Sequence, residues 1–309
     1  KIVYFEKKNL LTDYLDFKNL PNNINEILVK SNSTLIGIRD LFIINNKVFI
    51  SMMTRNENGI TINLYNGDLN LKKINFELFF ETNEYWENYN VFSGGRIEKF
   101  KDEKILFSIG FAKNYQSPQD KKSILGKIIA IDLNKKNAEL ISYGHRNPQG
   151  LYYQSDQNIV INTEHGPKGG DEINFNFLNL KNDKNFGWPK VSYGEAYKGE
   201  EKLFEKDTFK KSHKELGFIE PLKYYVPSIG ISEIIYLENN SFCKSKCLWA
   251  SSLRANSIYN LNVINDFNQL SSDGRIFLKG DRIRDIEYDK DLDLVILLSE
   301  NIPSIITIK

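Results

Sequence analysis

A two-strand unit that recurs along the chain constrains the fold more than any other feature of the sequence. Each copy begins at a small or polar residue and continues with a strand in which apolar and polar residues alternate. A polar turn and a strongly apolar strand that ends at Ser, Thr or Ala complete the copy. The five copies cover residues 38–51, 95–108, 150–163, 232–252 and 284–299. Alternation with a period of two predicts half-buried antiparallel strands, and the polar turns between them predict hairpins.

The spacing of these units predicts a β-propeller. Successive units start about 57, 55, 82 and 52 residues apart, and a period of roughly 50 residues with four strands per unit is typical of propeller blades. The longest interval contains an insertion at about residues 183–226. A large irregular β-sandwich is the alternative, although a sandwich need not repeat at this period. Only residues 11–17 and 206–216 have a pattern from which short helices could form.

The region before residue 37 holds two further strand-like segments, KIVYFEKK and TDYLDF, which resemble the outer strands of a blade. We therefore expect residues 1–309 to form a single propeller domain with an incomplete first blade.

Composition excludes several classes of function. The 309 residues include 41 Lys and Arg against 40 Asp and Glu, so a nucleic-acid partner, which requires a basic surface, is not expected. The chain contains no run of about 18 apolar residues that could span a membrane. Its first residues also lack the pattern of a signal peptide.

Two cysteines, Cys243 and Cys247, lie in the segment SFCKSKCLW. They make a poor zinc site because no other Cys or His is near them in the sequence. Free thiols and a short-loop disulfide formed in an oxidising compartment both remain open.

Three polar clusters are candidates for a binding face, because loops at one end of a propeller converge. The first is YGHRNPQGLY at residues 143–152. Arg146 offers a rigid fork for a carboxylate, and Asn147 offers both a donor and an acceptor. The alternative is that Arg146 pairs with a buried carboxylate and holds the loop together.

The second cluster is TEHGPKGGDEIN at residues 163–174. The carbonyls of Gly166 and Pro167 and the carboxylates of Glu164, Asp171 and Glu172 are oxygen ligands of the kind that calcium prefers. The spacing is not that of an EF-hand. A charged hairpin turn without a metal is the alternative.

The third cluster combines Arg254 with Arg282 and Arg284. The last two are two residues apart, so on a strand they share one face and need an anion or paired carboxylates beside them. Asp281 and Asp285 are the candidate internal partners.

These clusters resemble the family of pyrroloquinoline quinone (PQQ)-dependent soluble glucose and aldose sugar dehydrogenases, also called the glucose/sorbosone dehydrogenase family. The resemblance extends from about residue 30 to the end of the chain. Its most specific motifs are GHRNPQGL at 144–151, EHGPKGGDEIN at 164–174 and NFGWP at 185–189. Further matching segments are QSPQDKKSILGKIIAIDL at 116–133, PSIGIS at 227–232, SLR at 252–254 and DRIRDI at 281–286.

The resemblance implies an all-β, six-bladed propeller with four-stranded antiparallel blades that carries calcium and PQQ at one end. It implies that the cofactor contacts are Arg146, Asn147, Arg254, Arg282 and Arg284. The carbonyls of Gly166 and Pro167 match ligands of the cofactor-bound calcium, and Asp171 and Glu172 complete the candidate metal set.

The first half of the chain departs from the family pattern. Phe92 stands where the family has its general base, a histidine, and a phenyl ring cannot accept a proton. Leu35 or a nearby apolar residue stands where a cofactor-contacting glutamine is expected, and Phe111 follows Gly110 where the family has Asp. No catalytic residue is therefore assigned.

The three histidines offer weak substitutes for the missing base. His145 is expected to orient its loop, and His165 lies next to the calcium-binding carbonyls. His213, within the insertion, is expected to be solvated.

The sequence thus predicts a PQQ-dependent aldose dehydrogenase-like oxidoreductase whose base is replaced by Phe92. The alternative is a non-catalytic propeller that binds a small anion, a sugar or a protein partner. The resemblance implies a periplasmic or secreted protein and leaves the electron acceptor open.

Overall fold

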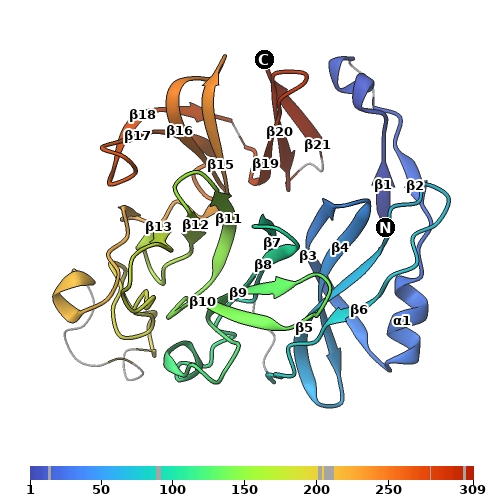
Figure 1. Cartoon of the computed structure of the whole chain (residues 1–309), viewed down its shortest axis with the longest axis horizontal. Coiled ribbons are helices and arrows are strands. Elements are labelled where there is room, and N and C mark those ends of the chain that lie inside the picture. The colour runs from blue at the N-terminus through green and yellow to red at the C-terminus, as the bar shows by residue number, and fades with distance from the viewer. Residues whose placement is uncertain (13–14, 88–91, 201–203, 205–211, 279, 302–303) are drawn as a thin grey trace. The chain divides into compact units, whose positions relative to one another are not determined.

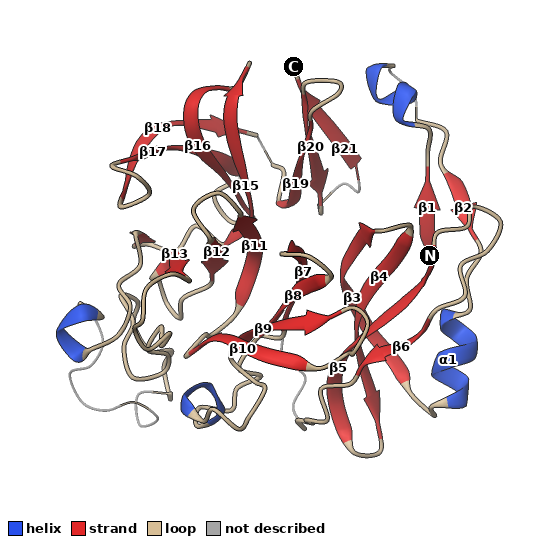
Figure 2. Cartoon of the chain, in the orientation of Figure 1, coloured by secondary structure: helices blue, strands red, loops and turns tan. Residues whose placement is uncertain are grey.

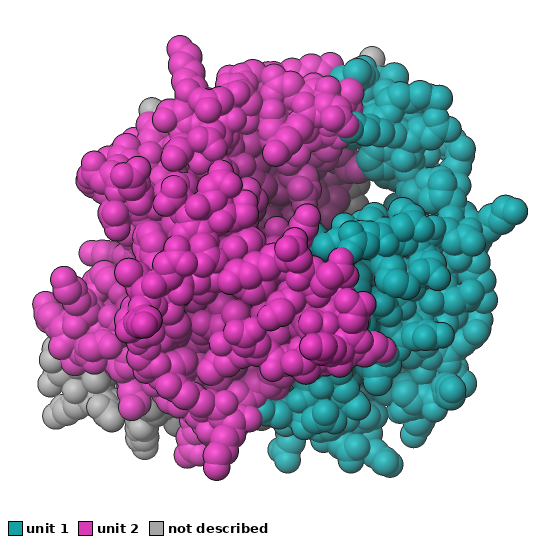
Figure 3. Space-filling model, in the orientation of Figure 1, with its two compact units in different colours: residues 1–90 teal, residues 91–309 magenta. Residues whose placement is uncertain are grey.

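The computed structural model describes residues 1–12, 15–87, 92–200, 204, 212–278, 280–301 and 304–309. The chain divides into two compact units, Lys1–Asn90 and Val91–Lys309 (Figure 3), and each is described by itself. That residues 1–309 form one domain stays a prediction.

The first unit is built on one four-stranded antiparallel sheet. Its strands follow in chain order: β3 (Thr34–Ile44), β4 (Lys47–Asn56), β5 (Gly59–Asp68) and β6 (Glu77–Phe80). Asn45 and Asn46 connect β3 to β4 with φ angles of 49° and 59°, and two positive φ angles in a two-residue loop are what a tight hairpin requires. Asparagine tolerates this conformation better than most residues.

The remaining elements of the first unit are short. A separate two-stranded sheet pairs β1 (Ile2–Tyr4) with β2 (Lys18–Leu20). The helical elements are a 3₁₀ turn at Lys7–Leu11 and the helix α1 (Ile24–Lys30). The helix buries Ile24 in a core cluster with Ile50 and Phe76, so it covers one face of the sheet.

The second unit contains four blade-like antiparallel sheets (Figures 1 and 2). The first comprises β7 (Gly94–Phe100), β8 (Lys104–Ile109), β9 (Lys127–Asp132) and β10 (Ala138–Tyr143), and the second comprises β11 (Pro148–Gln154), β12 (Ile159–Glu164), β13 (Asp171–Phe177) and β14 (Lys223–Tyr225). The third comprises β15 (Ile231–Asn240), β16 (Cys243–Ser252), β17 (Ser257–Ile264) and β18 (Gln269–Phe277), and the fourth comprises β19 (Ile283–Asp289), β20 (Leu294–Ser299) and β21 (Ser304–Ile308).

All five hairpins predicted from the sequence are confirmed as the first two strands of the five sheets. The fold is an all-β propeller, but the prediction of six blades is wrong, because the described residues form five. The segments before residue 34 form the short β1–β2 pair and α1 rather than a sixth blade, and the last described sheet has three strands rather than four.

Apolar layers between the sheets hold the second unit together. Ile234 and Ile235 are neighbours on β15 but belong to different core clusters, the first with Ile161 of β12 and the second with Leu297 of β20. Successive strand residues point to opposite faces of a sheet, so β15 packs against a different blade on each side.

The helix predictions were only partly informative. Lys214–Leu216 forms a 3₁₀ turn, while residues 205–211 lie outside the described part of the chain. The 11–17 segment contributes only the end of the 3₁₀ turn at Lys7–Leu11, and residues 13–14 are not described. The helix α1 was not predicted. No helix among the described residues is both long and apolar enough to cross a membrane.

The two cysteines form a disulfide, with Cα atoms 6.0 Å apart. Both Cys243 and Cys247 are buried in the core cluster that contains Trp249. Of the two alternatives left open by the sequence, the structure thus selects the short-loop disulfide.

Replacing both cysteines by serine should lower the free energy of unfolding by about 2 kcal/mol, because a short closed loop restricts the unfolded chain only modestly. Urea denaturation of the two proteins measures the difference. Wild-type protein unfolded without reductant should contain no reactive thiol, and two thiols per chain in that assay would contradict the assignment.

Candidate functional site

The loops that carry the predicted site residues lie at one end of the second unit. The first strands of its blades, β7, β11, β15 and β19, lie side by side (Figure 1), and their partner strands run antiparallel to them. The starts of these first strands and the ends of their partners therefore meet at the same end. We call this the site end; it includes residues 144–148, 165–170, 226–230, 253–256, 278 and 280–282.

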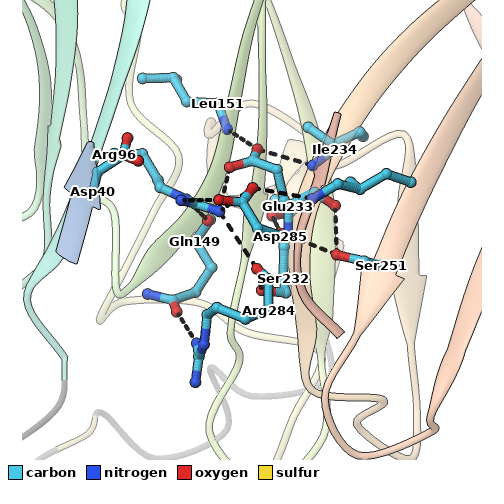
Figure 4. A network of polar contacts seen from close by, with 12 residues as sticks. Asp40, Arg96, Gln149, Leu151, Ser232, Glu233, Ile234, Ser251, Arg284 and Asp285 are labelled. Atoms are coloured by element: carbon cyan, nitrogen blue, oxygen red, sulfur yellow. Dashed lines mark hydrogen bonds and ion pairs between the residues drawn. The ribbon is translucent and has the colours of Figure 1, made fainter. Parts of the chain in front are cut away.

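A buried arginine connects the first strands of all four blades just below the site end (Figure 4). Arg96 of β7 donates from Nε to the carbonyl of Gln149 on β11 at 2.7 Å. Its Nη2 lies 2.5 Å from Glu233 Oε2 on β15 and 3.1 Å from Asp285 Oδ1 on β19. One cation thus serves two carboxylates: the side chains of Arg96 and Glu233 are 8% and 11% exposed, and that of Asp285 is 32% exposed.

The two carboxylates are fixed by further hydrogen bonds (Figure 4). Glu233 Oε1 accepts from the backbone N–H groups of Leu151 and Ile234, both at 2.9 Å. Asp285 Oδ1 accepts from the N–H of Ile286 at 3.0 Å. This network was not predicted from the sequence, and Arg96 is not among the predicted site residues. An arginine at the start of a first strand was the available signal.

Arg146 is enclosed by aromatic rings rather than paired with a carboxylate. Its guanidinium carbon lies 4.5 Å from the ring centre of Phe92, 5.2 Å from that of Trp188 and 5.6 Å from that of Phe111. The side chain donates to the carbonyl of His165 at 2.9 Å, and its buried Nε has no hydrogen-bond partner among the described residues. Burial lowers the pKa of this guanidinium, and cation–π contacts offset part of the cost.

The neighbouring Asn147 is part of the scaffold. Its Oδ1 accepts from the N–H of Gly94 and from Gln149 Nε2, both at 3.2 Å. Glu164 accepts from the backbone N–H groups of Arg146 and Asn147. Glu164 therefore binds the loop backbone, and the alternative of a local ion pair between a carboxylate and the Arg146 guanidinium is not observed.

His145 has the orienting role expected from the sequence. It is fully buried, with Nδ1 2.9 Å from Glu164 Oε2 and Nε2 2.8 Å from Ser142 Oγ. Its ring stacks on Phe186 with 4.8 Å between the ring centres. Both ring nitrogens are engaged, so His145 holds the 144–148 loop in place.

His165 is also engaged at both nitrogens. Its Nε2 donates to the carbonyl of Ile231 at 2.5 Å, which leaves Nδ1 as the acceptor facing Asn147 Nδ2 at 3.4 Å. Burial lowers its pKa, in agreement with a neutral ring. This geometry provides no free nitrogen for a substrate proton.

His213 is buried, so the expectation that it is solvated was wrong. Only 1% of the residue is exposed, because the described end of the insertion folds over β13 and brings Nε2 to 3.3 Å from Glu172 Oε1. Burial opposes the charged ring, but the charge and hydrogen bond of Glu172 outweigh it and raise the pKa of His213. The two residues line a small pocket with Arg146 and Glu164.

Asp171 anchors a turn instead of presenting its carboxylate. Its Oδ2 accepts from Ser228 Oγ at 2.7 Å and from the N–H groups of residues 229, 230 and 231 at 3.0, 2.7 and 3.1 Å. Its Oδ1 accepts from the N–H of Gly166 at 3.1 Å. Four donors on one oxygen leave no lone pair there for a cation.

The other predicted metal ligands lie close to this turn. Pro167 follows Gly166 in the same loop, and its carbonyl accepts from the hydroxyl of Tyr197 at 3.1 Å. Glu172 is occupied by His213 and by Asn174 Nδ2. Within the described part of the chain, no group of three or more His, Cys, Asp or Glu side chains is arranged to hold a metal ion.

Arg282 and Arg284 share one internal carboxylate, that of Glu300. Arg284 Nη2 lies 3.0 Å from both carboxylate oxygens, and Arg282 Nε lies 3.1 Å from Oε2. Burial alone would raise the pKa of Glu300, but the two arginines outweigh it and lower the pKa. The partners expected from the sequence, Asp281 and Asp285, do not pair with these arginines. Asp281 accepts from Ser299 Oγ at 2.9 Å, and Asp285 binds Arg96. Glu300, which follows the end of β20, binds both guanidiniums instead.

Arg254 is the exposed member of the set, and its guanidinium has no ion pair or hydrogen bond with any described residue. Its backbone N–H donates to the carbonyl of Ile229 at 3.0 Å. Asn256, two residues later, donates to the carbonyl of Asp281 at 2.8 Å, so the Arg254 loop lies beside the segment that leads to Arg282. Gly230 permits this approach, since a Cβ there would lie 3.0 Å from the Arg254 nitrogen.

The backbone segments that carry the predicted arginines therefore converge on residues 229–232. The Arg254 loop binds Ile229, His165 beside the Arg146 loop binds Ile231, and Ser232 donates to the carbonyl of Arg284 at 2.6 Å. The side chains are not equivalent. Arg146 is only 4% exposed, whereas the side chains of Arg282 and Arg284 are 40% and 36% exposed.

Comparison with known proteins shows what the chain is similar to. A family model described as Glucose / Sorbosone dehydrogenase matches residues 21–307. The aldose sugar dehydrogenase YliI of Escherichia coli is 31% identical over 225 residues, which are 67% of this chain and 57% of that protein. An uncharacterized protein of Synechocystis, slr1608, is 30% identical over 232 residues, which are 67% of this chain and 53% of that protein. The chain thus spans a little over half the length of these relatives.

Solved structures show the same fold. The soluble aldose sugar dehydrogenase of Escherichia coli in its apo form has a TM-score of 0.69 at 24% identity and covers 82% of this chain and 75% of its own. The PQQ-bound aldose sugar dehydrogenase of Streptomyces coelicolor has a TM-score of 0.61 at 20% identity, with 88% and 75% covered.

Replacing Arg96 by methionine should destabilise the protein by about 3–5 kcal/mol, because Glu233 and Asp285 lose their shared cation. Denaturant unfolding measures the loss. Lys104→Met, which removes one partner of an exposed pair with Glu139, is the matched control and should cost less than about 1 kcal/mol. Equal effects of the two variants would contradict the importance of the Arg96 network.

His213 should stabilise the protein more at low pH than at high pH. Its pKa is raised in the folded state, so its contribution is fully present below the unfolded pKa of about 6.5 and is lost as pH rises through the folded value. The difference in free energy of unfolding between wild type and His213→Asn should therefore be larger at pH 5.5 than at pH 9. A difference that grows toward high pH would contradict the assignment.

Proposed function

Because the chain belongs to the glucose/sorbosone dehydrogenase family, we propose that it is a sugar dehydrogenase-like oxidoreductase whose site end binds an anionic quinone of the PQQ class. The observation that carries the proposal is a surplus of positive charge. The guanidiniums of Arg254, Arg282 and Arg284 are open to solvent, and Glu300 is the single carboxylate bound to any of them among the described residues.

The donor set fits such a ligand. Guanidinium forks match the geometry of carboxylates, and a quinone with several carboxylates could contact Arg254 and the Arg282–Arg284 pair together. The carbonyls of Gly166 and Pro167 are hard oxygen donors of the kind that calcium requires. Asp171 and Glu172 are not included in this ligand set, because their carboxylates are already occupied.

Each residue at the site end has a definable task in this proposal. Arg282 and Arg284 would bind one carboxylate group, and Gln149 would orient Arg284 through its present contact of 3.2 Å. Arg254 would bind a second carboxylate. When bound, a quinone of this class supplies the acceptor for the hydride of the sugar. Arg146 contributes charge from behind its aromatic enclosure rather than a direct contact.

Proton removal is the step that this chain supports least. By the resemblance, Phe92 stands at the position of the base, and His145 and His165 have both ring nitrogens engaged. We therefore propose that sugar oxidation by the wild-type chain is slow.

A second candidate function is a non-catalytic propeller that binds an anion, a sugar or a protein partner. The packing of Phe92 against the guanidinium of Arg146 at 4.5 Å favours this second candidate. Phe92 and Phe111 enclose Arg146, so the arginine is stabilised without a bound ligand. Under this reading the open arginines still bind an anion, but no electron transfer follows.

We further propose that the protein works in the periplasm or outside the cell. The Cys243–Cys247 disulfide supports this location, because disulfides persist in oxidising compartments and are rare in the cytosol.

Titration of calcium-loaded protein with PQQ, followed by the quinone absorbance, tests the proposed function. We expect binding, and we expect Arg254→Met to weaken it roughly tenfold through loss of a charged hydrogen bond. The variant should fold normally because the Arg254 side chain has no hydrogen bond or ion pair with any described residue, and the substitution keeps the backbone hydrogen bond to Ile229. Lys104→Met is the control and should bind like wild type.

Sugar-driven reduction of a dye then separates the two candidates. Phe92→His should reduce the dye faster than wild type if a base is what the oxidoreductase lacks. PQQ binding without turnover in either protein would favour the non-catalytic candidate. Absence of PQQ binding would contradict the proposed cofactor.

A further inference from the structure

The Arg282–Arg284 pair already holds a carboxylate that belongs to the chain. Glu300 follows the end of β20, and its backbone N–H donates to the carbonyl of Arg282 at 2.9 Å. This bond fixes Glu300 directly opposite Arg282 across the hairpin. Its two carboxylate oxygens accept three hydrogen bonds of 3.0–3.1 Å from the two guanidiniums, which is the geometry of a bound carboxylate ligand.

Glu300 can be replaced by a ligand from solution. Its side chain is 42% exposed, and exposed ion pairs are weak because water solvates both partners after separation. The guanidinium of Arg284 does not depend on Glu300 for its position, because Gln149 Oε1 accepts from Nη1 at 3.2 Å. Displacement of the carboxylate would therefore leave a preformed fork rather than a disordered side chain.

The contrast with Asp285 shows that this arrangement is specific to Glu300. Asp285 is adjacent to Arg284 in the sequence, yet it binds Arg96 and the N–H of Ile286. A ligand that displaced it would remove one of the two carboxylates that neutralise Arg96. Glu300 has no such structural role among the described residues, since its side-chain hydrogen bonds there are all with Arg282 and Arg284.

We propose that Glu300 is an internal ligand mimic that competes with the carboxylate of an incoming anion for Arg282 and Arg284 and so determines which ligands bind. This inference rests on the proposed function, because it assigns a competitor to the same site. A ligand must displace Glu300, which costs the free energy of its ion pairs with Arg282 and Arg284. A second contact with the exposed Arg254 can offset this cost. Polycarboxylates should therefore bind much better than monocarboxylates, and neutral sugars should not compete for this fork.

Calorimetric titration with citrate, a tricarboxylate without redox chemistry, tests the proposal alongside PQQ. Glu300→Gln removes the competing charge and should tighten citrate binding roughly fivefold. Glu300→Asp keeps the charge but shortens the reach by one methylene, so it should give a smaller gain. Glu139→Gln removes a carboxylate from an exposed pair with Lys104 and should leave affinity unchanged. Acetate should bind far more weakly than citrate to wild type.

The outcomes distinguish this inference from the proposed function. If wild type binds PQQ but Glu300→Gln binds neither PQQ nor citrate more tightly, the competitor role is overturned while the proposed function stands. If Glu300→Gln binds citrate more tightly and no variant binds PQQ, the competitor role is supported and the proposed cofactor is wrong. If neither ligand binds wild type or any variant, both are overturned. Equal gains in citrate affinity from Glu300→Gln and Glu139→Gln would show that only the net charge of the protein matters, and would overturn the inference.

Discussion

A single buried cation, Arg96, holds together the first strands of four blades. These strands carry Glu233 and Asp285 as well as the backbone of Gln149, and without a shared positive charge the two carboxylates would repel each other. The loop of Arg146 leads into β11 and Arg284 lies on β19, whereas Arg254 follows β16, the partner strand of β15. The geometry of the site end is thus a consequence of charge balance at the level of Arg96.

Chemically identical side chains occupy three different environments above this network. Arg146 is dry and surrounded by rings, the Arg282–Arg284 pair shares an internal carboxylate, and Arg254 is solvated. Desolvation makes it costly to expose Arg146, whereas the exposed arginines can exchange partners at modest cost. We therefore propose that the exposed arginines bind the anion, although the most specific sequence motif surrounds Arg146.

Much of the fold could be predicted from local sequence. Apolar and polar residues alternate along the strands of the five hairpins because one face of each sheet is buried. Each hairpin forms at the residues predicted for it. The number of blades was not encoded in this way, because the described residues before 34 form the β1–β2 pair and α1 instead of a further four-stranded sheet. The helix α1 is held by packing against the sheet, which local propensity does not report.

The site was less predictable because its partners are distant in sequence. Arg96 and Asp285 are separated by 189 positions, so the neighbouring Arg284 looked like the natural partner of Asp285. Glu300 was missed for the same reason, since its role depends on the β19–β20 register. His213 seemed solvated because its neighbours are lysines and a serine, but Glu172 on β13 draws it inward. Motif resemblance located the arginines and could not show which of them were enclosed.

A crystal structure of the calcium-loaded protein soaked with PQQ would decide whether the open arginines form the anion site. The account predicts ligand carboxylates within hydrogen-bond distance of Arg254 and of the Arg282–Arg284 pair, with Glu300 turned away and Arg146 still enclosed by Phe92. Ligand density elsewhere on the protein, or a bound quinone that leaves the Glu300 contacts intact and does not touch Arg254, would contradict it.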